Sequence, residues 1–287
     1  MMFKMLAAEY NFRLGRRRGD VSLLRRAAKQ NIHNSRAAAE LARLGVPENI
    51  CTSLLINLAA LRAFTNHHQL ATQTKDLLEL AIRQLEISRG QLFQDVAASY
   101  FSGQKRDGFF LEVGTGDGET LSNTHMLEKH FGWRGILFEP DRRFHRSIES
   151  SRNAILDTRP AFSSDDTAVQ FLEVSRAGEL STLGDFKRVD GRHRFGSYYS
   201  AQTVTLTSAL EQHRAPSHID YVSIDTEGSE LEVLKGFDLA TYNVRFMTIE
   251  HNFVAGRRDA IAQYLLPYGY REVCSELSHQ DIWVLKD

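Results

Sequence analysis

The sequence predicts an α/β protein with a mostly parallel sheet and a separate helical module before it. After about residue 105, short apolar runs alternate with polar or glycine-containing turns and helix-like stretches, which is the pattern of repeated strand–helix–strand units. Between about residues 20 and 90, apolar residues instead recur at helical spacing. We therefore assign residues 1–95 to an N-terminal helical module and residues 96–287 to the α/β domain.

Charge also distinguishes the two parts of the chain. Residues 1–95 carry 14 Lys or Arg against 8 Asp or Glu, whereas the remaining residues carry 21 against 28. The simplest interpretation of the basic part is two or three helices that pack on each other or on the main domain. The alternative is an element that docks a partner or a second subunit. We expect it to pair subunits in a homo-oligomer.

Seven apolar runs are the expected strands of the sheet. They lie at 109–113, 135–139, within 154–162, and at 221–225, 244–250, 270–274 and 281–285. Several of them are continuously apolar, as strands of a parallel sheet covered by helices on both faces must be. Only a short polar stretch separates the last two runs, so we expect an antiparallel hairpin at the C-terminal end of the sheet.

One long segment, 176–203, does not follow this pattern. It is polar, contains glycine and is rich in aromatic residues. Long loops in compact domains are usually functional or disordered, so we interpret it as a loop that covers a substrate, with a mobile insertion as the alternative. Tyr198 and Tyr199 are candidate substrate-binding residues within it, because their flat faces suit a sugar ring.

Composition excludes several classes of protein. The chain has 287 residues, 42% of them hydrophobic and 25% charged, with a formal net charge of −1. No global basic field therefore attracts nucleic acid or anionic lipid. Cys51 and Cys274 are too few for a disulfide scaffold and lack metal-ligand spacing. No stretch is apolar enough to predict a membrane span, and we expect a cytoplasmic protein.

The string FLEVGTGDGETLSNT, which begins in the first expected strand, is the most informative part of the sequence. Gly114, Gly116 and Gly118 allow a sharp turn and a close approach of the backbone to a ligand. In an open α/β sheet, ligands bind at this end of the strands. A dinucleotide-binding turn needs a third glycine where this chain has Glu119, so NAD is disfavoured.

Two acidic residues indicate the kind of ligand. Glu112 places a negative charge beneath the turn, and Glu139 ends the second strand, where a carboxylate accepts hydrogen bonds from ribose hydroxyls. S-adenosylmethionine, a nucleoside with a cationic amino-acid tail, fits both residues. The alternative is a tight strand-to-helix turn that happens to carry surface carboxylates. We predict that the cofactor is bound by Glu112, Gly114, Gly116, Gly118 and Glu139.

These residues belong to strings that resemble the FkbM-type S-adenosylmethionine-dependent methyltransferases. The resemblance runs from SRGQLFQD (88–95) to the C-terminus and leaves out the N-terminal helices. It rests on GFFLEVGTGDGETLSNTHMLEKHFGWRGILFEPD (108–141), IDYVSIDTEGSELEVLKGF (219–237) and IEHN (249–252). The succession of these strings is specific to the family.

The resemblance implies a Rossmann-like class I methyltransferase fold and transfer of a sulfonium methyl group to an oxygen, often a hydroxyl of a sugar or natural product. A small hydroxylated substrate, with glycosides among the candidates, is the implied partner. Carried over residue by residue, Glu112 and the glycines match the cofactor turn, and Glu139 matches the ribose-binding acid. Asp225 matches the acidic end of the fourth strand, near the methionine tail and the acceptor, so the resemblance adds it to the residues expected to bind the cofactor.

Four polar residues end two neighbouring strands of the predicted sheet. Asp225 and Glu227 follow one strand, and Glu250 and His251 follow the next. Parallel neighbours bring these ends to one rim. Three uses stay open: His251 as a general base oriented by a carboxylate, an Mg²⁺ ion held by the three acids, or hydrogen bonding to substrate and cofactor alone. Asp225 and His251 are the candidate catalytic residues.

Two functions from other classes compete with a small-molecule O-methyltransferase. One is a methyltransferase fold that has lost catalysis and docks partners through its basic helical module. The complete set of acids and glycines argues against it. The other is a nucleic-acid methyltransferase, which is disfavoured because the predicted catalytic domain is net acidic.

Overall fold

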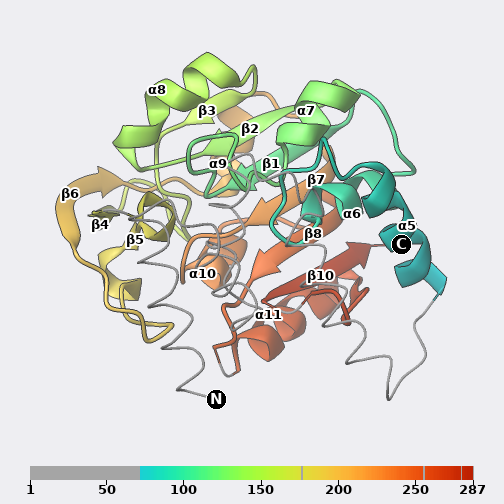
Figure 1. The fold of residues 1–287 in the computed structure, drawn as a ribbon. Coiled ribbons are helices and arrows are strands. Elements are labelled where there is room, and N and C mark those ends of the chain that lie inside the picture. Colours follow the sequence, from blue (N-terminus) through green and yellow to red (C-terminus); the bar gives the residue numbers. More distant parts are fainter. Residues whose placement is uncertain (1–71, 176, 255, 279, 287) are drawn as a thin grey trace, which may run out of the picture. The chain divides into compact units, whose positions relative to one another are not determined.

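The structure is a computed structural model that describes residues 72–286, except residues 176, 255 and 279. Its main feature is a seven-stranded sheet with strand order β3-β2-β1-β7-β8-β10-β9 (Figure 1). The strands are β1 (Phe109–Val113), β2 (Arg134–Phe138), β3 (Ile155–Asp157), β7 (His218–Ile224), β8 (Asn243–Glu250), β9 (Tyr270–Glu272) and β10 (Asp281–Lys286). All seven expected strands are therefore confirmed.

The sheet is parallel from β3 to β8. The reversed strand is β10, which pairs antiparallel with β8 on one side and with β9 on the other. The predicted hairpin of β9 and β10 is confirmed, but its second strand inserts between β8 and β9, so β9 forms the edge. This arrangement confirms the Rossmann-like methyltransferase fold.

Helices cover both faces of the sheet. They are α6 (Gln94–Phe101), α7 (His125–Phe131), α8 (Arg142–Ser151), α9 (Leu206–Gln212), α10 (Glu230–Lys235) and α11 (Arg257–Leu265). The last three pack with β1, β2, β7, β8 and β10 in one apolar cluster, which includes Leu210, Leu234 and Ile261. On the opposite face, α6 packs its Phe101 ring 4.7 Å from that of Phe246 in β8. None of the helices in the described part of the chain has the length and apolar character needed to cross a bilayer.

The interpretation of 176–203 as a long loop is wrong. A second, three-stranded antiparallel sheet contains β4 (Ala168–Val174), β5 (Thr182–Leu183) and β6 (Gly196–Gln202) in the order β5-β4-β6. Figure 1 shows this sheet beside the main sheet. The short 3₁₀ turn η1 (Gly178–Leu180) lies between β4 and β5, and η2 (Gly184–Phe186) lies between β5 and β6. The polar composition of β6 hid the strand because most of its side chains are exposed, so it lacks the apolar run that marks a buried strand.

One described helix precedes the predicted domain boundary. The helix α5 (Thr72–Arg83) buries Leu77 and Leu80, in agreement with the helical spacing there. Its Thr74 hydroxyl donates a 2.5 Å hydrogen bond to Glu276, 202 residues later. The other helices expected in 1–95, and the predicted subunit pairing, lie outside the described residues. The boundary at residue 95 stays a prediction.

Candidate functional site

The glycine turn that follows β1 brings two strand ends into contact. Gly114 has φ +87°, and a Cβ atom on it would lie 1.7 Å from the carbonyl oxygen of Asp225, just after β7. Only glycine fits this position, because a side chain would collide with backbone. Gly116 also has positive φ, +60°, but a Cβ there would meet nothing within 4 Å. The turn is thus closed against β7 at Gly114 and open at Gly116, as a ligand cradle requires.

Glu139, just after β2, is tied to this turn. Its Oε2 accepts hydrogen bonds from the amides of Thr115 at 3.1 Å and Gly116 at 2.7 Å, and its Oε1 accepts one from Asp141 at 2.8 Å. A carboxylate offers about four acceptor sites, so one stays available for a ribose hydroxyl. Burial raises the pKa of Glu139 to about 8, against the opposing effect of these amides.

The raised pKa of Glu139 predicts a pH-dependent stability. Because the pKa in the folded state, about 8, exceeds the unfolded value, the contribution of Glu139 is fully present below the unfolded pKa and is lost as pH rises through 8. Glu139→Gln removes this loss, but its side-chain NH2 group cannot accept a hydrogen bond from the backbone amides around it, so the variant is less stable than the wild type at pH 5. We expect the difference in Tm to move in favour of the variant by about 3 °C or more between pH 5 and pH 9. Parallel curves at both pH values in thermal unfolding would contradict the assignment.

Glu112, predicted to bind the cofactor, is buried beneath the turn. Its carboxylate accepts hydrogen bonds from the hydroxyls of Ser122 and Thr124 and, at 2.6 Å, from the amide of Asn123. The guanidinium of Arg152 lies 3.7 Å away. These contacts occupy both carboxylate oxygens with groups of the protein itself. Glu112 therefore holds the segment that follows the glycine turn, and its direct contact with a cofactor stays a prediction.

Sequence reasoning missed Asn123. Its Nδ2 donates a 2.9 Å hydrogen bond to Ser223 in β7, while its Oδ1 is buried without a hydrogen-bond partner among the described residues. A signal was present, since Asn123 lies in the SNT string that carries the family resemblance. Nothing in the sequence, however, distinguishes an asparagine with an unused acceptor from one whose acceptor is satisfied.

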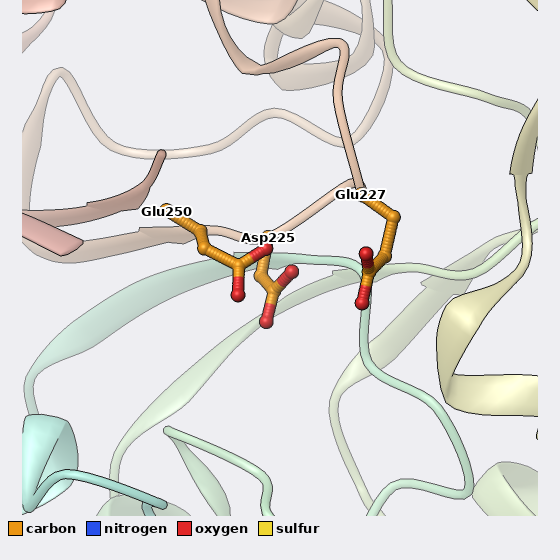
Figure 2. A group of neighbouring side chains, drawn as sticks. All are labelled: Asp225, Glu227 and Glu250. Atoms are coloured by element: carbon orange, nitrogen blue, oxygen red, sulfur yellow. The ribbon is translucent and has the colours of Figure 1, made fainter. Parts of the chain in front are cut away.

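Three of the four predicted rim residues do come together. Each of Asp225, Glu227 and Glu250 has a carboxylate oxygen within 4.8 Å of one on the other two. Figure 2 shows Asp225 between the two glutamates, with the carboxyl groups turned toward the same side. Asp225 is partly exposed, whereas both glutamates are buried. The cluster is therefore reached from solvent through Asp225.

Burial and mutual repulsion disfavour three negative charges in this cluster. The pKa of Glu250 is raised well above its ordinary value by burial and by the charges of Asp225 and Glu227. Burial also raises the pKa of Asp225, and burial together with Asp225 raises that of Glu227 to about 8. Acids so arranged share protons, so the cluster can accept one from a neighbouring group.

Glu227 connects the cluster to the segment before β6. Arg194 lies 2.5 Å and Arg192 3.4 Å from its Oε2. The amide of Asn252 donates hydrogen bonds to Glu227 and, at 2.6 Å, to Glu250. Two guanidinium groups beside the cluster repel a divalent cation and already neutralise a carboxylate that would have to bind it. The donor set thus fits Mg²⁺ poorly, although the spacing of the three acids matches that of metal ligands.

The hydrogen bonds of the His251 ring are made with groups other than the three acids. Its Nδ1 accepts a 3.2 Å hydrogen bond from the amide of Phe253, and its Nε2 lies 3.4 Å from Arg258. Burial and then the charge of Arg258 lower the pKa of His251. No hydrogen bond or ion pair joins its ring to the carboxylate of Asp225, Glu227 or Glu250 within the described residues, so the orienting carboxylate expected for a histidine base is missing there.

The two candidate substrate-binding tyrosines point to opposite sides of β6, because side chains alternate along a strand. The Tyr199 hydroxyl donates to the carbonyl of Pro140, and the guanidinium of Arg142 lies 3.9 Å from the centre of its ring. Tyr199 thus packs beside the segment that follows Glu139. Tyr198 is 47% exposed. Their role in substrate binding stays a prediction.

Comparison with known proteins identifies a matching protein family. The model of the methyltransferase FkbM domain matches residues 112–272. No curated protein matches the sequence. Among solved structures, the chain is similar to a crystal structure of a mutant of MtNAS, with 12% sequence identity and a TM-score of 0.33. That match covers 88% of this chain and 76% of the other.

Proposed function

Because this chain belongs to the FkbM methyltransferase family, we propose that it transfers the methyl group of S-adenosylmethionine to a hydroxyl of a small metabolite, sugar or natural product. The observation that carries this proposal is the pairing of the glycine turn with Glu139. A buried carboxylate with one unused acceptor site lies against a turn whose outer side is open at Gly116. This arrangement suits a ribose.

The residues of the site would have separate roles in binding the cofactor and in activating the acceptor. S-adenosylmethionine supplies an activated methyl group on a sulfonium, so the protein has to provide alignment and a more nucleophilic acceptor. The turn at Gly116 and the carboxylate of Glu139 would hold the nucleoside. Asp225, on the rim beside Gly114, would face the acceptor.

Asp225 is the proposed general base. Its partner Glu250 has a pKa raised well above the ordinary value, so Glu250 holds its proton and donates a hydrogen bond to the Asp225 carboxylate. Asp225 is also the least buried member of the cluster, which favours it as the one that an acceptor would meet. It would take the proton of the acceptor hydroxyl as the oxygen attacks. Burial keeps its pKa above the ordinary value for aspartate, which strengthens it as a base.

A transfer assay tests this function. The full chain is incubated with S-adenosylmethionine labelled in its methyl group and with a panel of hydroxylated glycosides. We expect label in at least one glycoside, on an oxygen by NMR, with addition of EDTA leaving the rate unchanged. Label found on nitrogen or carbon, or a strict requirement for Mg²⁺, would contradict the proposed reaction.

The non-catalytic alternative makes a different prediction in the same assay. A methyltransferase fold used only for docking would bind the cofactor weakly or not at all, and no acceptor would be labelled. The intact surroundings of Glu139 and Gly114 support the enzyme, because a relic is under no pressure to keep a buried carboxylate with a raised pKa.

A further inference from the structure

The connection between β5 and β6, residues 184–195, is a basic segment in an acidic domain. The domain as a whole, residues 96–287, carries 21 Lys or Arg against 28 Asp or Glu. Within the connection the balance is reversed, with Lys187, Arg188, Arg192 and Arg194 against Asp185 and Asp190. A local excess of positive charge attracts negatively charged ligands.

This connection lies against the loop that follows β7. The hydroxyl of Thr182, in β5, lies 3.2 Å from the carbonyl oxygens of both Thr226 and Glu227 and donates to them. A Cβ atom on Gly228 would lie 2.9 Å from the Cβ of Phe186, which belongs to the connection. The connection therefore forms one side of the proposed acceptor site.

Arg194 fixes the connection in this place. Its side chain is 1% exposed, and its Nη1 and Nη2 lie 2.7 and 2.8 Å from the carboxylate oxygens of Asp190. Nη2 also donates at 2.5 Å to Glu227, and Nε donates at 2.9 Å to the carbonyl of Leu180. All three nitrogens of this guanidinium are bound within the protein, so Arg194 is not available to a ligand.

Arg192 contacts the same two acids but keeps donors for a ligand. Its Nε lies 3.2 Å from Asp190 and its Nη1 lies 3.4 Å from Glu227, both longer than the contacts of Arg194. Its side chain is 47% exposed, and its Nη2 has no hydrogen-bond partner among the described residues. A guanidinium carries five N–H donors in a planar fork, so Arg192 can donate to a ligand while it keeps both ion pairs.

The charge of Arg192 also reaches Asp225, the proposed base. Burial raises the pKa of Asp225, and the positive charge of Arg192 opposes this rise. The carboxylate of Glu227, which Arg192 contacts, has an oxygen within 4.8 Å of one on Asp225. One sugar ring can therefore place a hydroxyl at Asp225 and a neighbouring substituent at Arg192.

The carboxylates of the connection do not balance its positive charge. Asp190 is shared by Arg192 and Arg194. Neither Lys187 nor Arg188 forms an ion pair within the described part of the chain. An anionic substituent near Arg192 would therefore be attracted by the connection, and this attraction offsets its repulsion by the acid cluster.

We propose that Arg192 binds an anionic group of the methyl acceptor, a carboxylate or a phosphate, and so selects acidic glycosides over neutral ones. The planar fork of a guanidinium matches both groups. The inference rests on the proposed function and names the class of acceptor. Arg192 determines specificity by holding the anion, while Asp225 takes the proton of the hydroxyl.

Matched acceptors test the proposal in the transfer assay. The panel contains the methyl glycosides of glucose, galactose and mannose, each accompanied by the corresponding uronate and 6-phosphate, so that the two anions are compared separately. The proteins are the full-length wild type, Arg192→Ala, Arg192→Lys and the control Arg188→Ala. The control removes an exposed arginine of the same connection that forms no described ion pair.

We expect the wild type to use an acidic acceptor with a kcat/KM at least about 10-fold higher than that of its neutral counterpart. Arg192→Ala should raise KM for the acidic acceptor about 10-fold or more and leave that for the neutral one within about twofold. Arg192→Lys should recover part of the loss, because it keeps the charge but not the planar fork. Arg188→Ala should behave like the wild type.

Equal use of acidic and neutral acceptors by the wild type, or a preference for the neutral series, would overturn the inference and leave the proposed methyl transfer intact. So would the absence of any loss in Arg192→Ala, or equal losses with both series, which would show that Arg192 only holds the acid cluster in place. Label in none of the acceptors would refute the glycoside acceptor and the inference together. The wild-type comparison keeps the test valid if Arg192→Ala does not fold.

Discussion

The Gly114→Ala protein is expected to bind S-adenosylhomocysteine at least about 100-fold more weakly than the wild type. The added methyl group would lie 1.7 Å from the carbonyl oxygen of Asp225, in a residue whose φ is +87°. Neither atom belongs to a flexible side chain, so the ends of β1 and β7 have to separate. The turn that holds the nucleoside and the residue that faces the acceptor would both move. Calorimetry measures the loss of binding.

Gly103→Ala is the matched control. Gly103 has φ +67°, and a Cβ there meets nothing within 4 Å. It therefore carries the same conformational cost as Gly114→Ala but no collision. We expect Gly103→Ala to lower the Tm slightly and to bind the ligand like the wild type. Wild-type affinity in Gly114→Ala, or an equal loss in both variants, would show that contact between the two strand ends does not form the site.

The second large effect concerns turnover. With the best acceptor found in the glycoside panel, Asp225→Asn should lower kcat by about 10²- to 10⁴-fold, because the amide cannot take the proton of the hydroxyl. Its affinity for S-adenosylhomocysteine should change by less than about tenfold. The exposed Asp259, in the first turn of α11, gives the control Asp259→Asn, which should retain wild-type turnover.

The variant His251→Gln distinguishes a reaction in which Asp225 is the base from one in which His251 is the base. The contacts of His251 are with the Phe253 amide and Arg258, and burial lowers its pKa. We therefore expect the variant to keep kcat within about tenfold of the wild type. A loss as large as that of Asp225→Asn, with cofactor affinity intact, would move the role of base from Asp225 to His251.

Much of the fold could be predicted because its signals are local. Buried parallel strands are continuous apolar runs, and Gly114 marks a turn that no other residue could form. The rim of the sheet was predictable for the same reason: Asp225 directly follows β7 and Glu250 ends β8, which pairs with β7, so topology alone brings them together.

The parts that escaped prediction depend on contacts between distant segments. β6 became visible only as a paired strand, since a polar, exposed strand has no apolar run. β4 was not among the expected strands although Phe171, Leu172 and Val174 are buried, because polar residues interrupt its short apolar run. The ion pair of Arg194 with Glu227 joins residues 33 positions apart and changes the chemistry of the cluster, from a metal-ligand set to acids partly neutralised by arginine. The sequence gives the charges of such residues but does not show which of them form ion pairs in the folded protein.

The position of a residue also does not reveal what its side chain bonds to. Glu112 has the place of a cofactor-binding acid, yet Ser122, Asn123 and Thr124 occupy its oxygens. The buried acid and the Asn123 amide that it holds are adjacent in space, although 11 residues separate them in the chain.

The central claim is that the glycine turn and Glu139 bind the nucleoside of S-adenosylmethionine. A calorimetric titration of S-adenosylhomocysteine into the wild type and into Glu139→Gln tests it most directly. We expect micromolar binding by the wild type and a loss of about 10-fold or more in the variant, which lacks the carboxylate. Absence of binding by the wild type, or equal affinity in both proteins, would contradict the claim.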